Sequence, residues 1–213
     1  MPDHRVLVHA WPDAAPLALE ALRGKQALTI IRIATPNTEI RHAAREQVRT
    51  ALRELLAALL QQPAATLPLV AQPGQTLVLD LPGTPIGLSV SHAPGCSVAA
   101  VHRHGAVGVD VMRIGEGADW MPDWGAVARD YLGAQAQARI DQVTPDQRAC
   151  AFAREWTALE ACLKCLGMGL TEWTPALAQR LAGCAVTALD VPLGFCGAVA
   201  VPKNQGIQSS AWM

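Results

Sequence analysis

The segment Phe152–Leu170 constrains the fold of this chain most, because it combines the apolar pattern of a packed helix with one row of polar residues. Trp156, Glu160 and Lys164 are spaced four residues apart, which places them along one face of an α-helix. Gly167 favours the end of that helix, since glycine readily takes the left-handed conformation that closes one. Taken alone, a Glu and a Lys one turn apart indicate only an ordinary ion pair on a solvated face.

A second feature is an acid inside an apolar strand. The strand predicted at residues 106–112 contains Gly108-Val109-Asp110-Val111-Met112, and its carboxylate is costly to bury unless another group compensates the charge. Upstream, the strand predicted at residues 86–91 ends at Ser91-His92. These segments and the helix around Glu160 occur in a fixed order along the chain, so we consider them together.

Together the three motifs resemble the Sfp-type 4'-phosphopantetheinyl transferase family. The signature of that family is a G-[VI]-D-[VI]-x strand followed by W-[ST]-x-x-E-A-x-x-K, matched here by Gly108–Met112 and Trp156–Lys164. The family also carries a Ser-His pair upstream of the strand, matched by Ser91-His92. The resemblance covers roughly residues 40 to 200.

The resemblance implies an α+β fold of two similar α/β lobes, related by a pseudo-two-fold axis, with the active site between them. We place the N-terminal lobe at residues 1–103, and the C-terminal lobe with the metal and catalytic motifs at residues 104–213. The hydrophobic pattern agrees, because long helices are predicted at 39–62 and at 146–166, each followed by strands. A turn just before residue 39 is predicted to cap the first of these helices. We find no residue-level repeat between the halves.

Turn residues such as Pro-Gly pairs divide the rest of the chain into short elements. Short helices are predicted at residues 13–24, 126–132 and 134–143, and strands at residues 5–11, 28–33, 66–70, 76–79, 86–91, 96–102, 106–112, 185–189 and 194–201.

By resemblance, the chain is an enzyme that transfers the 4'-phosphopantetheine of its substrate coenzyme A to a serine hydroxyl of an apo acyl or peptidyl carrier protein. The other product is 3',5'-adenosine bisphosphate. The resemblance implies Mg²⁺ held by Asp110 and Glu160, since this ion is usually bound by one or two carboxylates together with phosphate oxygens and waters. Asp110, Glu160 and Lys164 are the predicted catalytic residues: Lys164 compensates the pyrophosphate charge, and Glu160 is a candidate general base.

The predicted coenzyme A ligands are cationic or hydrogen-bonding groups. Ser91, His92 and Lys164 are carried over from the family, although a histidine at a turn is often purely structural. The stripe Arg41, Arg45 and Arg49 is a candidate for the 3'-phosphate. The alternative is that this stripe is a solvated helix face, balanced by the acids of the same helix.

Three positions depart from the family pattern. Met112 stands where many members carry a third acid, and a thioether is a poor ligand for Mg²⁺, so we expect water or another oxygen there. Leu159 and Gln75 each replace a common lysine. These departures keep open a second hypothesis, a degenerate member that binds coenzyme A or a carrier protein without catalysis. A third is a purely structural two-lobed protein.

The composition argues against several other classes of protein. With 51% hydrophobic and 16% charged residues, the chain is expected to be globular, and its net charge of −1 lacks the basic excess typical of a nucleic-acid binder. We see no leader peptide or membrane span, and we expect a cytoplasmic protein that acts as a monomer, as pseudo-dimeric members of the family do. The six cysteines are then expected to be free thiols, with Cys162 and Cys165 packing their helix.

Overall fold

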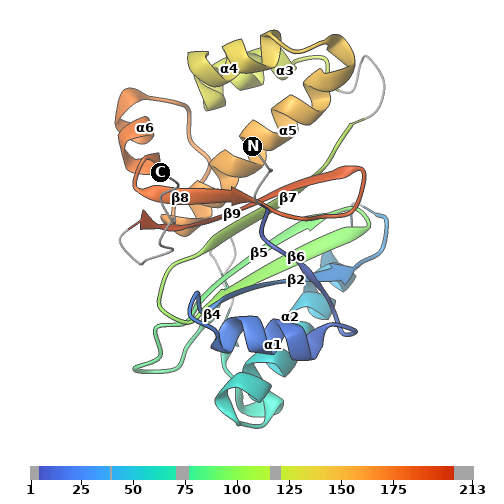
Figure 1. Ribbon diagram of the computed structural model, residues 1–213, viewed down its shortest axis with the longest axis vertical. Coiled ribbons are helices and arrows are strands. Elements are labelled where there is room, and N and C mark those ends of the chain that lie inside the picture. Colours follow the sequence, from blue (N-terminus) through green and yellow to red (C-terminus); the bar gives the residue numbers. More distant parts are fainter. Residues whose placement is uncertain (1–4, 39, 71–76, 116–120, 204–213) are drawn as a thin grey trace.

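Two β-sheets lie at the centre of the protein, and helices cover their outer faces (Figure 1). The computed structural model describes residues 5–38, 40–70, 77–115 and 121–203. The first sheet has the strand order β1-β2-β6-β5, and the second has the order β7-β9-β8. The resulting mixture of helices and sheets agrees with the predicted α+β class, whereas the pseudo-two-fold axis and the lobe boundaries at 103 and 104 stay predictions.

The first sheet is antiparallel except for its short first strand, and two helices pack on one of its faces. Its elements are β1 (His9–Ala10), β2 (Leu28–Ala34), β5 (Gly87–Ala93) and β6 (Cys96–His102), with α1 (Ala15–Arg23) and α2 (His42–Leu60). A 3₁₀ turn, η1 (Ala64–Thr66), leads into the ribbon formed by β3 (Leu69–Val70) and β4 (Val78–Leu79).

The second sheet is fully antiparallel, and the longest helix packs on it. Its strands are β7 (Gly108–Arg113), β8 (Cys184–Ala188) and β9 (Phe195–Pro202). The helical elements of this part are α3 (Trp124–Val127), the π-helical turn η2 (Ala128–Leu132), α4 (Ala134–Asp141), α5 (Pro145–Cys165) and α6 (Pro175–Leu181).

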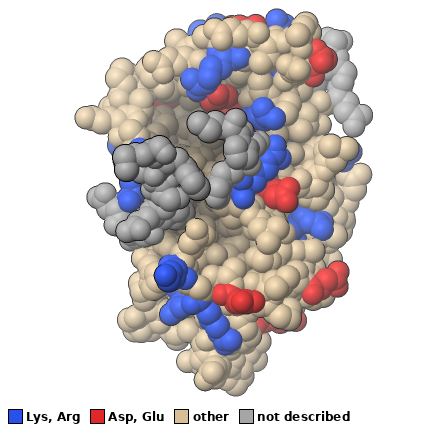
Figure 2. Space-filling model, in the orientation of Figure 1, with Lys and Arg blue, Asp and Glu red and all other residues tan. Residues whose placement is uncertain are grey.

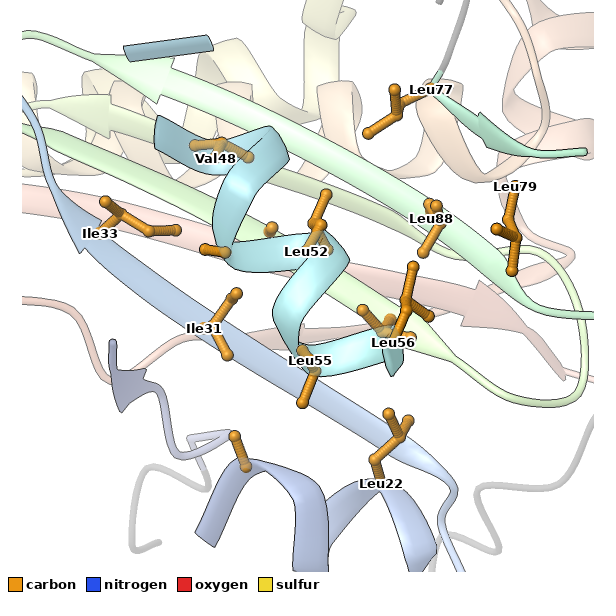
Figure 3. Close-up of a cluster of buried hydrophobic side chains, with 14 of the residues drawn as sticks. Leu22, Ile31, Ile33, Val48, Leu52, Leu55, Leu56, Leu77, Leu79 and Leu88 are labelled. Carbon is orange, nitrogen blue, oxygen red and sulfur yellow. The ribbon is translucent and has the colours of Figure 1, made fainter. Parts of the chain in front are cut away.

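Helix α2 covers the outer face of the first sheet with one apolar stripe (Figure 3). Val48, Leu52 and Leu55 follow the helical period and are almost fully buried. They pack in one cluster with Ile31 of β2 and Leu88 of β5. This packing fixes α2 relative to β5, and therefore places the start of the helix beside the end of that strand.

A second apolar core lies between the two sheets. Ile30 and Val98 of the first sheet pack with Val109 and Val199 of the second, and all four are buried. Because side chains alternate along a strand, the same residues that fill this core leave Asp110 pointing to the opposite face of β7. That opposite face is the one covered by α5.

Gly108 allows β7 to approach α5 closely. A Cβ atom at this position would overlap the carbonyl oxygen of Ala161, and would also crowd the backbone nitrogen of Cys165. The glycine of the G-V-D segment is therefore required by packing, and it brings Asp110 within reach of side chains on the helix.

The edges of the two sheets meet where β5 runs beside β7. The N–H groups of Val109 and Val111 point away from β9, and they donate to Ser89 Oγ at 3.0 Å and to Ser91 Oγ at 3.2 Å. A parallel bridge between Ile86 and Gly105 extends this contact. Two serine hydroxyls thus replace the backbone ladder that would otherwise join the edges.

Most predicted elements are present among the described residues, with several differences. The strand predicted at 76–79 keeps Val78–Leu79. The strand predicted at 5–11 is reduced to His9–Ala10 and a bridge from Val6 to Leu189, and the one predicted at 66–70 keeps only Leu69–Val70. The predicted cap of the helix at 39–62 is wrong: α2 begins at His42, and its N-cap residue forms no side-chain hydrogen bond. Helix α6 was not predicted. Glu39 and the segment with Gln75 lie outside the described residues.

The surface carries both signs of charge. Over the face shown in Figure 2, Lys and Arg residues lie among Asp and Glu residues and larger uncharged areas. Within the described part of the chain, every helix is too short or too polar to cross a membrane.

We predict that Ser89→Ala lowers the free energy of unfolding by about 1–3 kcal/mol, because it leaves the buried Val109 N–H without an acceptor. Ser89 is 1% exposed. Urea denaturation measures the change. Thr38→Ala is the matched control, since Thr38 also accepts a backbone N–H, from Ile40, but at an exposed position where water can replace it. Equal losses in the two variants would contradict this role of Ser89.

Candidate active site

Three elements converge on one carboxylate oxygen. Asp110 of β7 is only 7% exposed, and its Oδ1 accepts hydrogen bonds from Lys164 Nζ of α5 and Ser91 Oγ of β5, each at 2.7 Å. Lys164 Nζ also donates to the carbonyl oxygen of Val109 at 3.1 Å. The structure therefore brings together Asp110, Lys164 and Ser91, which sequence analysis had selected from three separate motifs.

Glu160 lies one turn before Lys164 on α5 and is half-buried. Burial raises the pKa of its carboxyl, and the negative charge of Asp110 raises it further, while Lys164 acts in the opposite direction. Two carboxylates thus share a poorly solvated neighbourhood with one ammonium group. Such a group both attracts a further cation and favours a carboxylate that can accept a proton.

The donor set of this site fits a hard divalent cation. A cation would relieve the repulsion between Asp110 and Glu160, and both hydrogen bonds to Asp110 end on the same oxygen, Oδ1. In the described ranges, no cluster of three or more His, Cys, Asp or Glu side chains is arranged to hold a metal. An ion bound here would therefore take its remaining ligands from phosphate oxygens and water, as Mg²⁺ commonly does.

Met112, which stands at the predicted position of a third acid, packs at the side of an apolar cluster instead. That cluster joins η2, α4, α5 and α6, and it includes Trp156, which stacks on Phe152 with ring centroids 5.7 Å apart. The side chain of Met112 is thus used for packing. Trp156, although it belongs to the predicted row on the helix, anchors the helical layer.

His92 lies at the end of β5, opposite Ser97 of β6. Its Nδ1 forms a 2.8 Å hydrogen bond with Ser97 Oγ. Burial lowers the pKa of His92 to about 4, with further contributions from the positive charges of Arg41, Arg45 and Lys164. The imidazole is therefore neutral at pH 7, and it lies within electrostatic reach of both the arginine stripe and the Asp110 site.

The arginine stripe of α2 divides into two parts. Arg41 and Arg45, at the start of the helix, act on His92. Arg49 instead donates to Glu46 at 2.9 Å, which fits the alternative interpretation of a solvated helix face. The role of Arg49 at the 3'-phosphate stays a prediction, and the structure gives it no contact with the other site residues.

Sequence reasoning missed Ser97, Thr35 and Arg113. Thr35 Oγ1 and Ser97 Oγ are 3.1 Å apart and both side chains are buried, while Arg113 donates to Asn37 Oδ1 at 2.9 Å. The sequence signal for Ser97 is the turn dipeptide Pro94-Gly95. A two-residue turn fixes the register of the hairpin, and that register pairs His92 with Ser97.

The cysteines form no disulfide among the described residues. Cys162 and Cys165 lie on α5 in a cluster with Cys184 of β8, where burial raises the pKa of both helix thiols to about 12. They are therefore protonated near neutral pH, as expected for thiols that pack a helix. A pocket of about 310 Å³ lies on this side of α5, lined by residues such as Leu159 and Trp173, and it contains none of the predicted site residues.

Residues 106–186 match the 4'-phosphopantetheinyl transferase superfamily. The matched segment begins just before β7 and ends within β8, so it contains Asp110, Glu160 and Lys164 but not Ser91 or His92. No curated protein matches the chain.

The match supports transferase chemistry on the phosphopantetheine group in general terms, and the mixed fold is consistent with it. It does not distinguish an Sfp-type enzyme from the holo-acyl-carrier-protein synthases, so the finer assignment stays a prediction.

The lowered pKa of His92 predicts a specific pH dependence of stability. The unfolded chain binds a proton at His92 near pH 6.5, whereas the folded protein does so only near pH 4. The stabilising contribution is therefore complete above pH 6.5 and is lost as the pH falls from 6.5 to about 4. Over this window His92→Gln should lose less free energy of unfolding than the wild type, as measured by urea denaturation.

His42→Gln is the control, because His42 is exposed at the start of α2. Its stability should follow the wild-type curve. If His92→Gln also follows that curve, the burial of a neutral His92 is disproved.

Proposed function

We propose that this protein transfers 4'-phosphopantetheine from coenzyme A to the serine hydroxyl of an apo acyl or peptidyl carrier protein, as an Sfp-type transferase. The proposal is carried by one observation. Asp110, Glu160 and Lys164 meet at the contact between β7 and α5, inside the segment that matches the superfamily. Action as a cytoplasmic monomer is part of the same proposal.

The reaction replaces the phosphoanhydride bond within the pyrophosphate of coenzyme A by a phosphoester bond to the serine. The serine oxygen bonds to the phosphorus of the phosphopantetheine, and the bond from that phosphorus to the bridging oxygen of the pyrophosphate breaks. The leaving group is 3',5'-adenosine bisphosphate, and the serine proton passes to a base. Catalysis of such a step depends mainly on positioning and on compensating negative charge.

The residues present suit these tasks. Lys164 supplies a fixed positive charge for the pyrophosphate, held in place by Asp110 and the carbonyl of Val109. Glu160 is the candidate base, because its raised pKa favours uptake of the serine proton, directly or through a water. Mg²⁺, held by Asp110 and Glu160, would add positive charge where negative charge develops on the phosphates.

The adenosine phosphates are assigned to the other side of the β5–β7 contact. His92, Arg41 and Arg45 lie close enough to interact electrostatically, and a neutral histidine near two guanidinium groups suits a phosphate anion. Ser91 connects the two regions, since it directly precedes His92 in β5 and donates to Asp110.

One observation favours the alternative, a binder of coenzyme A without catalysis. Oδ1 of Asp110 already accepts hydrogen bonds from Lys164 and Ser91, and the ammonium group of Lys164 compensates the charge of this carboxylate. Together with Met112 in a packing role, this arrangement is also compatible with a site that has lost its ion.

The decisive measurement is intact-mass spectrometry of an apo carrier protein incubated with this protein, coenzyme A and Mg²⁺. We expect the wild type to add one phosphopantetheine to the carrier serine. Asp110→Asn and Glu160→Gln should each reduce the initial rate at least ~100-fold, since each removes a charge from a site that works by electrostatic compensation.

Glu155→Gln is the matched control. Glu155 is another acid of α5, but it pairs with Arg139 on α4 rather than with the site, and the glutamine keeps an acceptor for that arginine. Its transfer rate should remain within about twofold of wild type. Coenzyme A binding without transfer, over several carriers and with Mn²⁺ as well, would replace the proposal with the non-catalytic binder.

A further inference from the structure

Three polar groups form a hydrogen-bonded chain under the candidate phosphate site. His92 of β5 contacts Ser97 of β6, and Ser97 Oγ also contacts Thr35 Oγ1, just after β2. Ser97 is fully buried and Thr35 is 8% exposed. Two hydroxyls buried at the end of an apolar sheet cost free energy unless they are paired, and here they are paired with each other and with one imidazole.

The register of the sheet makes this chain rigid. Ser97 pairs with His92 on one side and with Ile33 on the other, so Ser97 occupies the middle strand. The tight turn Pro94-Gly95 keeps His92 and Ser97 opposite each other, and Gly95 supplies the positive φ of 85° that the turn needs. The imidazole therefore cannot rotate without breaking the contact of its Nδ1 with Ser97.

Hydrogen-bond counting then decides which ring nitrogen carries the proton when an anion is bound. A neutral imidazole has one N–H, and phosphate oxygens accept hydrogen bonds. A phosphate can bond the ring only if Nε2 carries that hydrogen, which leaves Nδ1 as an acceptor. Ser97 must then donate to Nδ1, and its own oxygen accepts from Thr35.

We propose that Ser97 and Thr35 are positioning residues for His92. The Thr35 hydroxyl donates to Ser97 Oγ and the Ser97 hydroxyl donates to Nδ1 of His92, so that Nε2–H is presented to a phosphate of coenzyme A. This inference rests on the proposed function, because it takes coenzyme A as the ligand. It assigns Ser97 and Thr35 no contact with the substrate; they act through the orientation and tautomer of His92.

Thr35→Val and Ser97→Ala test the proposal by calorimetric titration with coenzyme A. Each should weaken binding about threefold to tenfold, the range expected for the loss of one hydrogen bond. In the transfer assay, KM for coenzyme A should rise by a similar factor while kcat stays near its wild-type value. On a His92→Ala background, Ser97→Ala should have no further effect.

Thr29→Val is a close control for Thr35→Val. Thr29 is buried on β2, the strand that ends just before Thr35, at 2% exposure. Its hydroxyl has no hydrogen-bond partner among the described residues, so valine keeps the shape and removes nothing that is used. Coenzyme A binding by Thr29→Val should match wild type. Equal effects of the two substitutions, or additive effects of Ser97→Ala and His92→Ala, would overturn the proposal.

The ring tautomer is measured independently by ¹⁵N NMR of the imidazole. We expect hydrogen on Nε2 in the wild type with coenzyme A bound, and a mixture of tautomers in unliganded Ser97→Ala. Hydrogen on Nδ1 in the complex would overturn the proposal while leaving the proposed function intact. Absence of coenzyme A binding to the wild type would instead overturn the proposed function, and with it the ligand part of this inference.

Discussion

The hydrogen bonds from β7 to the serines of β5 determine how the rest of the structure is arranged. Neither sheet supplies a backbone partner for the outer N–H groups of Val109 and Val111, so the hydroxyls of Ser89 and Ser91 perform that task. This contact sets the distance between two sheets whose facing apolar side chains pack in one core. Because Ser91 also donates to Asp110, the same contact that joins the sheets orients the candidate catalytic carboxylate.

Helix α5 meets two requirements with different faces. Small residues such as Ala161 let it lie directly over Gly108, where any side chain on the strand would collide with the helix backbone. The face that carries Glu160 and Lys164 is turned to Asp110. The close approach and the polar contact depend on each other, because Lys164 reaches both Asp110 and the Val109 carbonyl only from a helix that lies this near.

The parts of the fold that follow from local pattern could be predicted from the sequence. The long helices and the strands around Ser97 and Asp110 have clear periods, and the motifs selected Asp110, Lys164 and Ser91, which hydrogen bonds join in the structure. Helix α6 was missed although Thr174-Pro175 is a good helix start, and Thr174 indeed accepts from Leu177 N–H. The start of α2 was misplaced because its N-cap has no side-chain hydrogen bond to signal it.

What could not be predicted depends on long-range partners. The pairing of Arg49 with Glu46 is a local i,i+3 contact that the helical pattern allows, but nothing in the stripe indicates that Arg41 and Arg45 act on His92 of a distant strand. Similarly, the burial of Ser89 and Ser91 against β7 requires knowing which strand edges meet. The hydroxyl chain of Thr35 and Ser97 could be predicted only in part. The turn sets the register that pairs Ser97 with His92, but it does not indicate the contact of Ser97 with Thr35.

The shared core between the sheets has a consequence for how such a chain can be divided or recombined. A cut between residues 103 and 104 separates the strands of Val98 and Val109, whose side chains fill one core, and it separates Val6 from its bridge to Leu189. Each half alone would present an apolar sheet face to water. The two halves are therefore a single folding unit rather than exchangeable modules, and chimaeras between relatives would have to match the side-chain volumes on both sides of that interface.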